Sequence, residues 1–140
     1  MGFEIILMMV LSFLFPIIML FFGILMKSGW PRKINDFAGF RTTRAKSSNE
    51  AWRFAHKLCG NIWTVLSIVL LIPNVVIIAL FFYMNSIRPD AFVMGLNNDS
   101  VLNISIVSTV VSAMAMIVSV VFVQVRLCEK FDKDGAAREE

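Results

Sequence analysis

Three long apolar stretches, separated by two polar connections, dominate the pattern of this chain. They cover residues 5–26, 62–84 and 101–125, and none contains Asp, Glu, Lys or Arg. Each exceeds the roughly 20 residues that a helix needs to cross the hydrocarbon core of a bilayer. Because a segment in lipid must satisfy its own backbone hydrogen bonds, we expect each to be helical. The pattern predicts an all-α integral membrane protein with three transmembrane helices.

Composition supports the membrane class. The chain is 58% hydrophobic and only 16% charged, and its mean hydropathy is +0.76. A soluble domain of this size would need more charge on its surface. The first apolar stretch follows the acidic leader MGFE and is too long for the core of a cleavable signal peptide, so we expect it to remain as a membrane helix.

The distribution of Lys and Arg predicts the orientation. The second connection, residues 85–100, carries only Arg88, and the segment after Val125 carries four basic residues. Basic loops stay in the cytoplasm, so the first connection and the C-terminus should lie inside and the N-terminus outside. The first connection holds eight basic residues: Lys27, Arg32, Lys33, Arg41, Arg44, Lys46, Arg53 and Lys57.

We therefore divide the chain into a single membrane domain, residues 1–126, and a cytoplasmic tail, residues 127–140. The last ten residues mix charges without apolar periodicity, which predicts a frayed, solvated tail. The net charge of +3 gathers in the first connection and favours membrane lipids of an anionic leaflet as partners. Nucleic acid is a poor alternative, because no nucleic-acid-binding module accompanies these basic residues.

The polar block of residues 27–61 is predicted to contain a loop and a helix. Gly29 and Pro31 should end the first helix and leave Trp30 at headgroup level. Ser47 and Glu50 have the spacing of a capping box, so a helix should start near Ser48.

The helix that follows has an aromatic face flanked by Arg53 and Lys57, as an interfacial helix on a membrane surface would. An unbroken helix from residue 48 to residue 84 would be about 55 Å long, well beyond a bilayer of about 30 Å. We expect an interfacial cytoplasmic helix before the second span, with a bend near Gly60 and Asn61 or a projection into the cytoplasm. The face consists of Trp52, His56, Cys59 and Trp63.

Two polar features fall inside the spans. Asn74 lies near the middle of the second span and should face the other helices, where its amide can find a partner. The third span carries a stripe of small hydroxyl residues, which predicts a packing face, with a polar substrate path as the alternative. The stripe consists of Ser105, Ser108, Thr109, Ser112 and Ser119.

The chain offers little for catalysis or metal binding. His56 is its only histidine, and neither Glu50 nor Cys59 completes a metal site with it by spacing. We expect His56 to form hydrogen bonds within the protein. Cys59 and Cys128 should be inert thiols. The three apolar stretches contain no Asp, Glu, Lys, Arg or His, which argues against an enzyme or transporter. We expect no cofactor, no metal and no enzymatic activity.

The polar block resembles the signature of the bacterial SdpI/YfhL family, the immunity proteins of the sporulation-delaying toxin. The segment GFRT, followed after a short basic spacer by SSNEAWRFAHKLCG, carries the resemblance. The signature covers about 22 residues between two apolar stretches. The matching residues, which we take as the candidate site, are Gly39, Phe40, Arg41, Thr42, Asn49, Trp52, Ala55, His56 and Gly60.

The resemblance implies a multipass protein of the bacterial plasma membrane without enzymatic activity. It implies immunity to a membrane-active peptide toxin, and it suggests a cytoplasmic repressor as a weaker candidate partner. The founding immunity protein is longer, with further helices before the signature, so its additional functions do not transfer directly. A homo-oligomer is compatible with the sequence.

Two roles for the signature remain open at the sequence level. Arg41 is a candidate for binding a lipid phosphate, a carboxylate such as that of Glu50, or a partner chain. Alternatively, GFRT only docks the loop onto the bundle. The competing function is a small membrane scaffold or accessory subunit that binds lipid or a larger complex.

Overall fold

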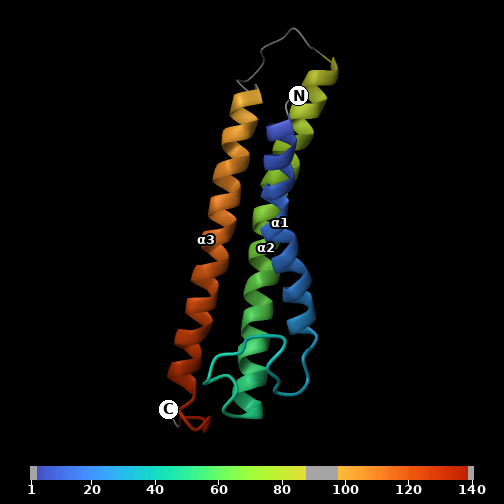
Figure 1. The fold of residues 1–140 in the computed structure, drawn as a ribbon. Helices are drawn as coiled ribbons and strands as arrows, with labels where there is room; N and C mark the ends of the chain where they lie inside the picture. Colours follow the sequence, from blue (N-terminus) through green and yellow to red (C-terminus); the bar gives the residue numbers. More distant parts are fainter. Residues whose placement is uncertain (1–2, 88–97, 139–140) are drawn as a thin grey trace.

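The computed structural model describes residues 3–87 and 98–138, which form a bundle of three long helices (Figure 1). The helices are α1 (Phe3–Lys27), α2 (Asn49–Ile87) and α3 (Asn98–Lys130). All three are long and apolar enough to cross a membrane, which confirms the predicted number of spans. Arg88 and most of the second connection lie outside the described residues.

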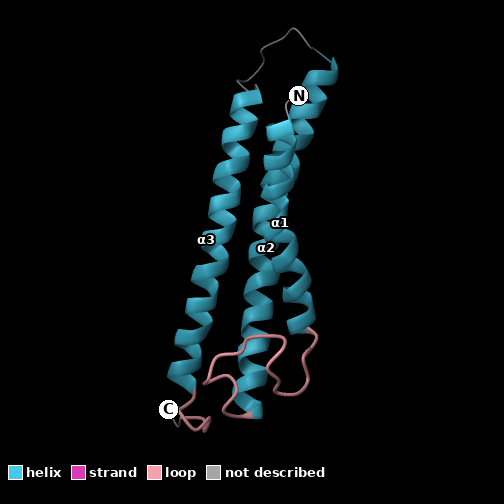
Figure 2. Cartoon of the chain, viewed as in Figure 1, coloured by secondary structure: helices cyan, strands magenta, loops and turns pink. Residues whose placement is uncertain are grey.

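The polar connection between α1 and α2 and the C-terminal residues gather at one end of the bundle, whereas the N-terminus lies at the other (Figure 2). We call this end the cap; it comprises residues 28–59 and 127–138. A buried apolar cluster forms the interior of the cap and extends to the adjoining turns of α1 and α3. Its larger members are Met26, Phe40, Cys59, Val123, Leu127 and Phe131.

The end of α1 follows the sequence prediction. The Trp30 N–H donates to the carbonyl of Leu25 (3.1 Å) and the Gly29 N–H to that of Met26 (3.1 Å), which satisfies the last turn of the helix. Trp30 is 41% exposed, and its placement at headgroup level stays a prediction.

The interfacial helix predicted ahead of the second span is not present as a separate element. Its residues form the first turns of α2, which continues without a break through Gly60 and Asn61. Its face does not lie toward lipid either: Trp52 and His56 are 1% and 3% exposed. The reason is that the connection folds back over this face and buries it, so no membrane surface is needed to cover the rings.

The start of α2 is where the sequence placed it, but the cap residue differs. The Ala51 N–H donates to Ser48 Oγ (3.1 Å), so Ser48 is the N-cap. Ser47 instead donates its hydroxyl to the carbonyl of Arg44 (2.7 Å). The predicted capping box of Ser47 and Glu50 was therefore wrong by one residue, because the helix begins at Asn49.

Close backbone contact joins α1 to α2 at Gly60. A Cβ atom at this position would lie 2.6 Å from the backbone N of Lys27 and 2.9 Å from the carbonyl oxygen of Gly23. Only glycine allows this approach, which is typical of small residues at membrane helix interfaces. Gly60 therefore fixes α2 against the end of α1.

The hydroxyl stripe of α3 is a packing face, as predicted. Ser105, Ser112 and Ser119 are at most 4% exposed. Ser119 Oγ accepts a hydrogen bond from Trp63 Nε1 (2.8 Å). The Ser108 hydroxyl donates to Oδ1 of Asn74 (2.9 Å), and Asn74 is buried against the bundle as expected.

The predicted fraying of the C-terminal tail was wrong for residues 131–138, although most of these residues are exposed to solvent as predicted. Phe131 is 3% exposed, and residues 131 and 137 form an isolated antiparallel bridge. Oδ1 of Asp132 accepts the N–H groups of Asp134 (3.0 Å) and Ala136 (2.9 Å). The turn lies against the start of α2, where Gly135 contacts Ser47. Phe131, the one large apolar residue of this segment, anchors it to the core.

Candidate functional site

His56 ties the connection to α2 through both of its ring nitrogens. Nδ1 lies 2.7 Å from the carbonyl oxygen of Trp52, and Nε2 lies 3.0 Å from the backbone N of Phe40. A carbonyl only accepts and an N–H only donates, so these partners assign the neutral tautomer with the proton on Nδ1. Neither nitrogen is left for a metal or a substrate in this arrangement.

Gly39 lets the connection pass directly over His56. Its φ of +97° lies in the left-handed region, and a Cβ atom there would be 2.1 Å from His56 Nε2. No other residue fits without displacing the imidazole. The next residue, Phe40, then inserts its ring into the apolar cluster, where it is 6% exposed.

Trp52 holds the part of the connection that directly follows α1. Its Nε1–H donates to the carbonyl of Pro31 (2.8 Å), and its ring lies 4.2 Å from the imidazole of His56. Ala55, one turn along, is fully buried, so the connection approaches α2 closely here. We call this set the motif lock; it consists of Gly39, Phe40, Trp52, Ala55 and His56.

Replacing Trp52 by Phe should lower the free energy of unfolding by about 2 kcal/mol, since the buried carbonyl of Pro31 loses its donor and the smaller ring leaves a void. The matched control is Trp30→Phe, because Trp30 is 41% exposed; its change should be within about 0.5 kcal/mol. Unfolding of the purified protein in detergent, titrated with SDS and followed by circular dichroism, measures both. Equal losses would contradict the role of the Trp52 indole N–H.

Two other signature residues, Arg41 and Asn49, are exposed and take no part in the lock. Nη1 of Arg41 donates to the backbone carbonyl of Asp36, which fixes the arginine beside the connection. Lys46 Nζ lies 2.7 Å from the Asp36 carboxylate, and this hydrogen bond lowers the pKa of Asp36. No ion pair between Arg41 and Glu50 occurs among the residues that the structure describes.

Thr42 shapes the turn that follows Arg41. Its Oγ1 accepts the N–H of Ala45 (3.3 Å), and its carbonyl accepts that of Lys46 (3.1 Å). Ala45 is thereby buried in the apolar cluster of the cap. The turn holds Arg41 and Thr43 on the outer side, where both are exposed.

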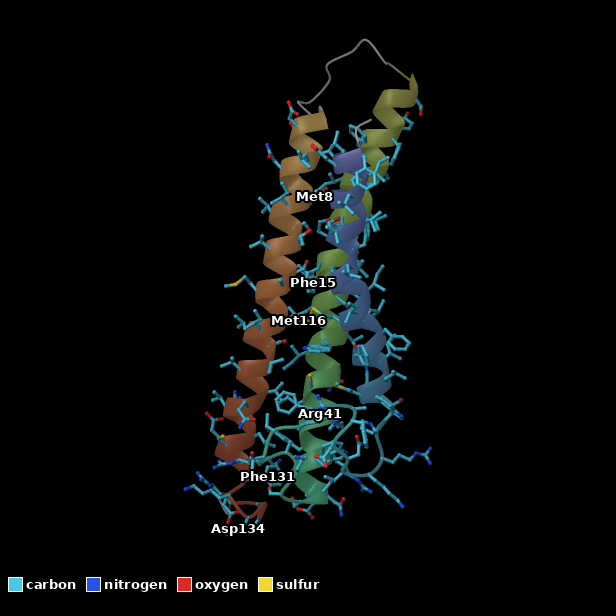
Figure 3. All side chains as sticks on the ribbon, in the orientation of Figure 1. Met8, Phe15, Arg41, Met116, Phe131 and Asp134 are labelled. Atoms are coloured by element: carbon cyan, nitrogen blue, oxygen red, sulfur yellow. The ribbon has the colours of Figure 1, made fainter. Side chains whose placement is uncertain are left out.

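Arg41 borders a cavity of about 560 Å³ between the connection and the end of α3. Figure 3 shows Arg41 and Phe131 at the same end of the bundle. Three cationic side chains border the cavity, two from the connection and one from the C-terminal turn, which suits it to an anionic group. Its lining residues are Arg41, Thr42, Thr43, Arg44, Gln124, Cys128 and Lys133.

Arg44 was not singled out from the sequence, yet it joins the connection to α3. Its Nη1 donates to the carbonyls of Cys128 (3.1 Å) and Phe131 (3.2 Å) at the end of that helix. A cation at a helix C-terminus is favourable, because the last carbonyls are otherwise unpaired. These partners are separated by 84 and 87 residues in sequence, so no local signal identifies them.

The two cysteines and the possible metal ligands were the remaining candidates for reactive or metal-binding side chains. Cys59 is buried and Cys128 half-buried, and both are free thiols. Within residues 3–87 and 98–138, no group of three His, Cys, Asp or Glu side chains is placed to hold a metal ion.

The model of the SdpI/YfhL protein family matches residues 32–124, which span the signature, α2 and most of α3. No curated protein and no solved structure matches the chain.

Proposed function

Because the chain belongs to the SdpI/YfhL protein family, we propose that it is a non-enzymatic membrane protein that protects its cell from a membrane-active peptide toxin. The proposal rests on the immunity role that the resemblance of the signature implies, and that role involves no catalysis. In our proposal the N-terminus lies outside and the cap lies at the cytoplasmic face of the plasma membrane, as the excess of basic residues in the first connection favours.

The observation that carries the proposal is that most signature residues hold the fold together, whereas Arg41 is exposed and available to bind a partner. Six of the signature residues are buried or in close contact with other segments and hold the connection, α2 and α1 together, namely the motif lock and Gly60. Arg41 is exposed on the same connection and faces a cavity with further cations. A signature that served packing alone would have no need of an exposed arginine at this position.

In the mechanism we propose, the lock holds the connection still and Arg41 binds the partner. A guanidinium presents a fixed fork of donors that matches a carboxylate, and Arg44 and Lys133 add positive charge around the same cavity. A peptide that inserts across the membrane brings one end to the inner face, where its terminal carboxylate fits this cavity. Binding there would keep the peptide from assembling into a lesion.

The experiment compares a naive bacterial host with and without this protein during exposure to the sporulation-delaying toxin peptide. Survival and membrane potential are the measurements. We expect cells with the protein to keep both at toxin levels that collapse the potential of control cells. Equal survival and equal depolarisation across a panel of membrane-active peptides would contradict the immunity function.

A second candidate function is a small scaffold that binds a larger complex or a cytoplasmic repressor. It is favoured by Phe37, which is 92% exposed on the connection. Exposed aromatic side chains of this kind are common anchors in protein interfaces. If Phe37→Ser releases a co-purifying protein while toxin protection is absent with either form, scaffolding is the better description.

A further inference from the structure

A second cavity lies between the end of α1 and the first turns of α2. Its volume is about 400 Å³, within the range of about 300–1,000 Å³ that is typical of ligand pockets. Met26, Pro31, Trp52 and His56 supply its buried walls. Its rim carries four exposed cations from three segments: Lys27, Arg32, Arg53 and Lys57.

These four charges have no anionic partner among the described residues. The two ion pairs found there join Lys46 to Asp36 and Arg126 to Glu129. None of the described residues that line the cavity is acidic. Four like charges around one cavity repel one another, so a bound anion would stabilise this arrangement.

The position of the cavity along the bundle identifies the anion. Lys27 is the last residue of α1, and its backbone N lies against Gly60 of α2. Trp30, three residues on, is exposed as at a headgroup boundary. Toward the middle of α1 the exposed side chains are apolar, including Phe21 and Ile24. The cavity therefore sits where the apolar surface of the span ends.

We propose that this cavity binds the phosphate headgroup of an anionic phospholipid in the leaflet at the cap end, with its acyl chains along the exposed face of α1. Recognition falls to the four cations, because the polar ring atoms of Trp52 and His56 already bond within the protein. The bound lipid would bridge α1, the connection and α2 beside the motif lock. This site is separate from the Arg41 cavity and does not depend on toxin protection.

The test is native mass spectrometry of the purified full chain in detergent with added phosphatidylglycerol, phosphatidylcholine or inorganic phosphate. We expect one tightly bound phosphatidylglycerol, and much weaker binding of the zwitterionic lipid and of free phosphate. The double variant Arg32→Gln, Lys57→Gln should bind phosphatidylglycerol about 30-fold more weakly, at about fivefold for each charge lost near the surface. Both side chains are exposed, so the fold should persist, which circular dichroism checks.

The matched control is Lys33→Gln, Arg138→Gln, which removes the same charge from exposed residues outside the cavity. Its affinity should stay within about twofold of the wild type, and Lys57→Arg, which keeps the charge, should also retain binding. Equal weakening by both double variants would mean general attraction to the net charge and would overturn the site. Binding of phosphatidylcholine as tight as phosphatidylglycerol, or of phosphate without the lipid, would overturn it too.

Discussion

Gly39→Ala should lower the free energy of unfolding by about 3 kcal/mol. The left-handed backbone at φ +97° costs an L-residue about 1–2 kcal/mol. The new methyl group would also fall 2.1 Å from His56 Nε2 and push the imidazole off the Phe40 N–H. A buried donor and acceptor left unpaired cost about 1–3 kcal/mol more. SDS titration of the purified protein, followed by circular dichroism, measures the change.

Gly29→Ala is the matched control, since it separates backbone strain from the clash. Gly29 also has a positive φ, +88°, but nothing lies within 4 Å of the position of its Cβ. The free energy of unfolding of the control should therefore fall by only about 1 kcal/mol. If both variants lower the free energy of unfolding equally, His56 does not hold the connection, and the proposed role of the motif lock is contradicted.

The spans were predictable because hydropathy is a local property of the chain. Residues 5–26, 62–84 and 101–125 all lie within observed helices. The extra turns of α3 after residue 125 were not predicted, and those at the start of α2 were predicted either as an interfacial helix joined by a bend or as a projection of the span. They carry charge on their outer sides while residues such as Trp52 and Leu127 pack inward, so a search for uncharged runs ends too early.

The aromatic face was wrongly predicted to lie against the membrane, because the same spacing of aromatic residues suits a face covered by lipid and a face covered by protein. Trp52 and His56 do share a face, but a folded loop covers it instead of lipid. The deciding contact, from Phe40 to His56, spans 16 residues and depends on the turn at Gly39. Periodicity within a helix cannot report such a contact.

The signature was recognised in the sequence, but the role of each of its residues could be assigned only from the three-dimensional structure. Phe40, Trp52, Ala55 and His56 are buried together and Gly39 lies against His56. Gly60 packs against α1, whereas Arg41 and Asn49 stay exposed. The neighbouring residues Phe40 and Arg41 differ in burial: the side chain of Phe40 is buried, whereas that of Arg41 is exposed. Only the fold shows which residues hold the connection and which are left for a partner.

Arg41→Lys should abolish most of the protection while leaving the fold intact. Lysine keeps the positive charge but loses the forked donors that pair with a carboxylate and that also reach the Asp36 carbonyl. Losing one charge-assisted hydrogen bond of this kind costs about 1.5–3 kcal/mol, which weakens partner binding about tenfold or more. Because Arg41 is exposed, the free energy of unfolding should change by less than about 0.5 kcal/mol.

Arg126→Lys is the matched control for this change. Arg126 is also exposed and makes one surface ion pair, with Glu129 at 3.1 Å, on α3. Exposed pairs of this kind contribute about 0–1 kcal/mol, so its replacement should affect neither stability nor protection appreciably. The pair of variants separates a requirement for the guanidinium of Arg41 from a general sensitivity to arginine replacement.

The most direct measurement is the toxin concentration that depolarises half of the cells, determined at matched membrane abundance for the wild type, Arg41→Lys and Arg126→Lys. If the cap presents Arg41 to a toxin, this concentration falls about tenfold for Arg41→Lys and stays at the wild-type level for Arg126→Lys. Full protection by the Arg41→Lys protein, with its unfolding transition unchanged, would contradict the claim that the motif lock serves to present this arginine.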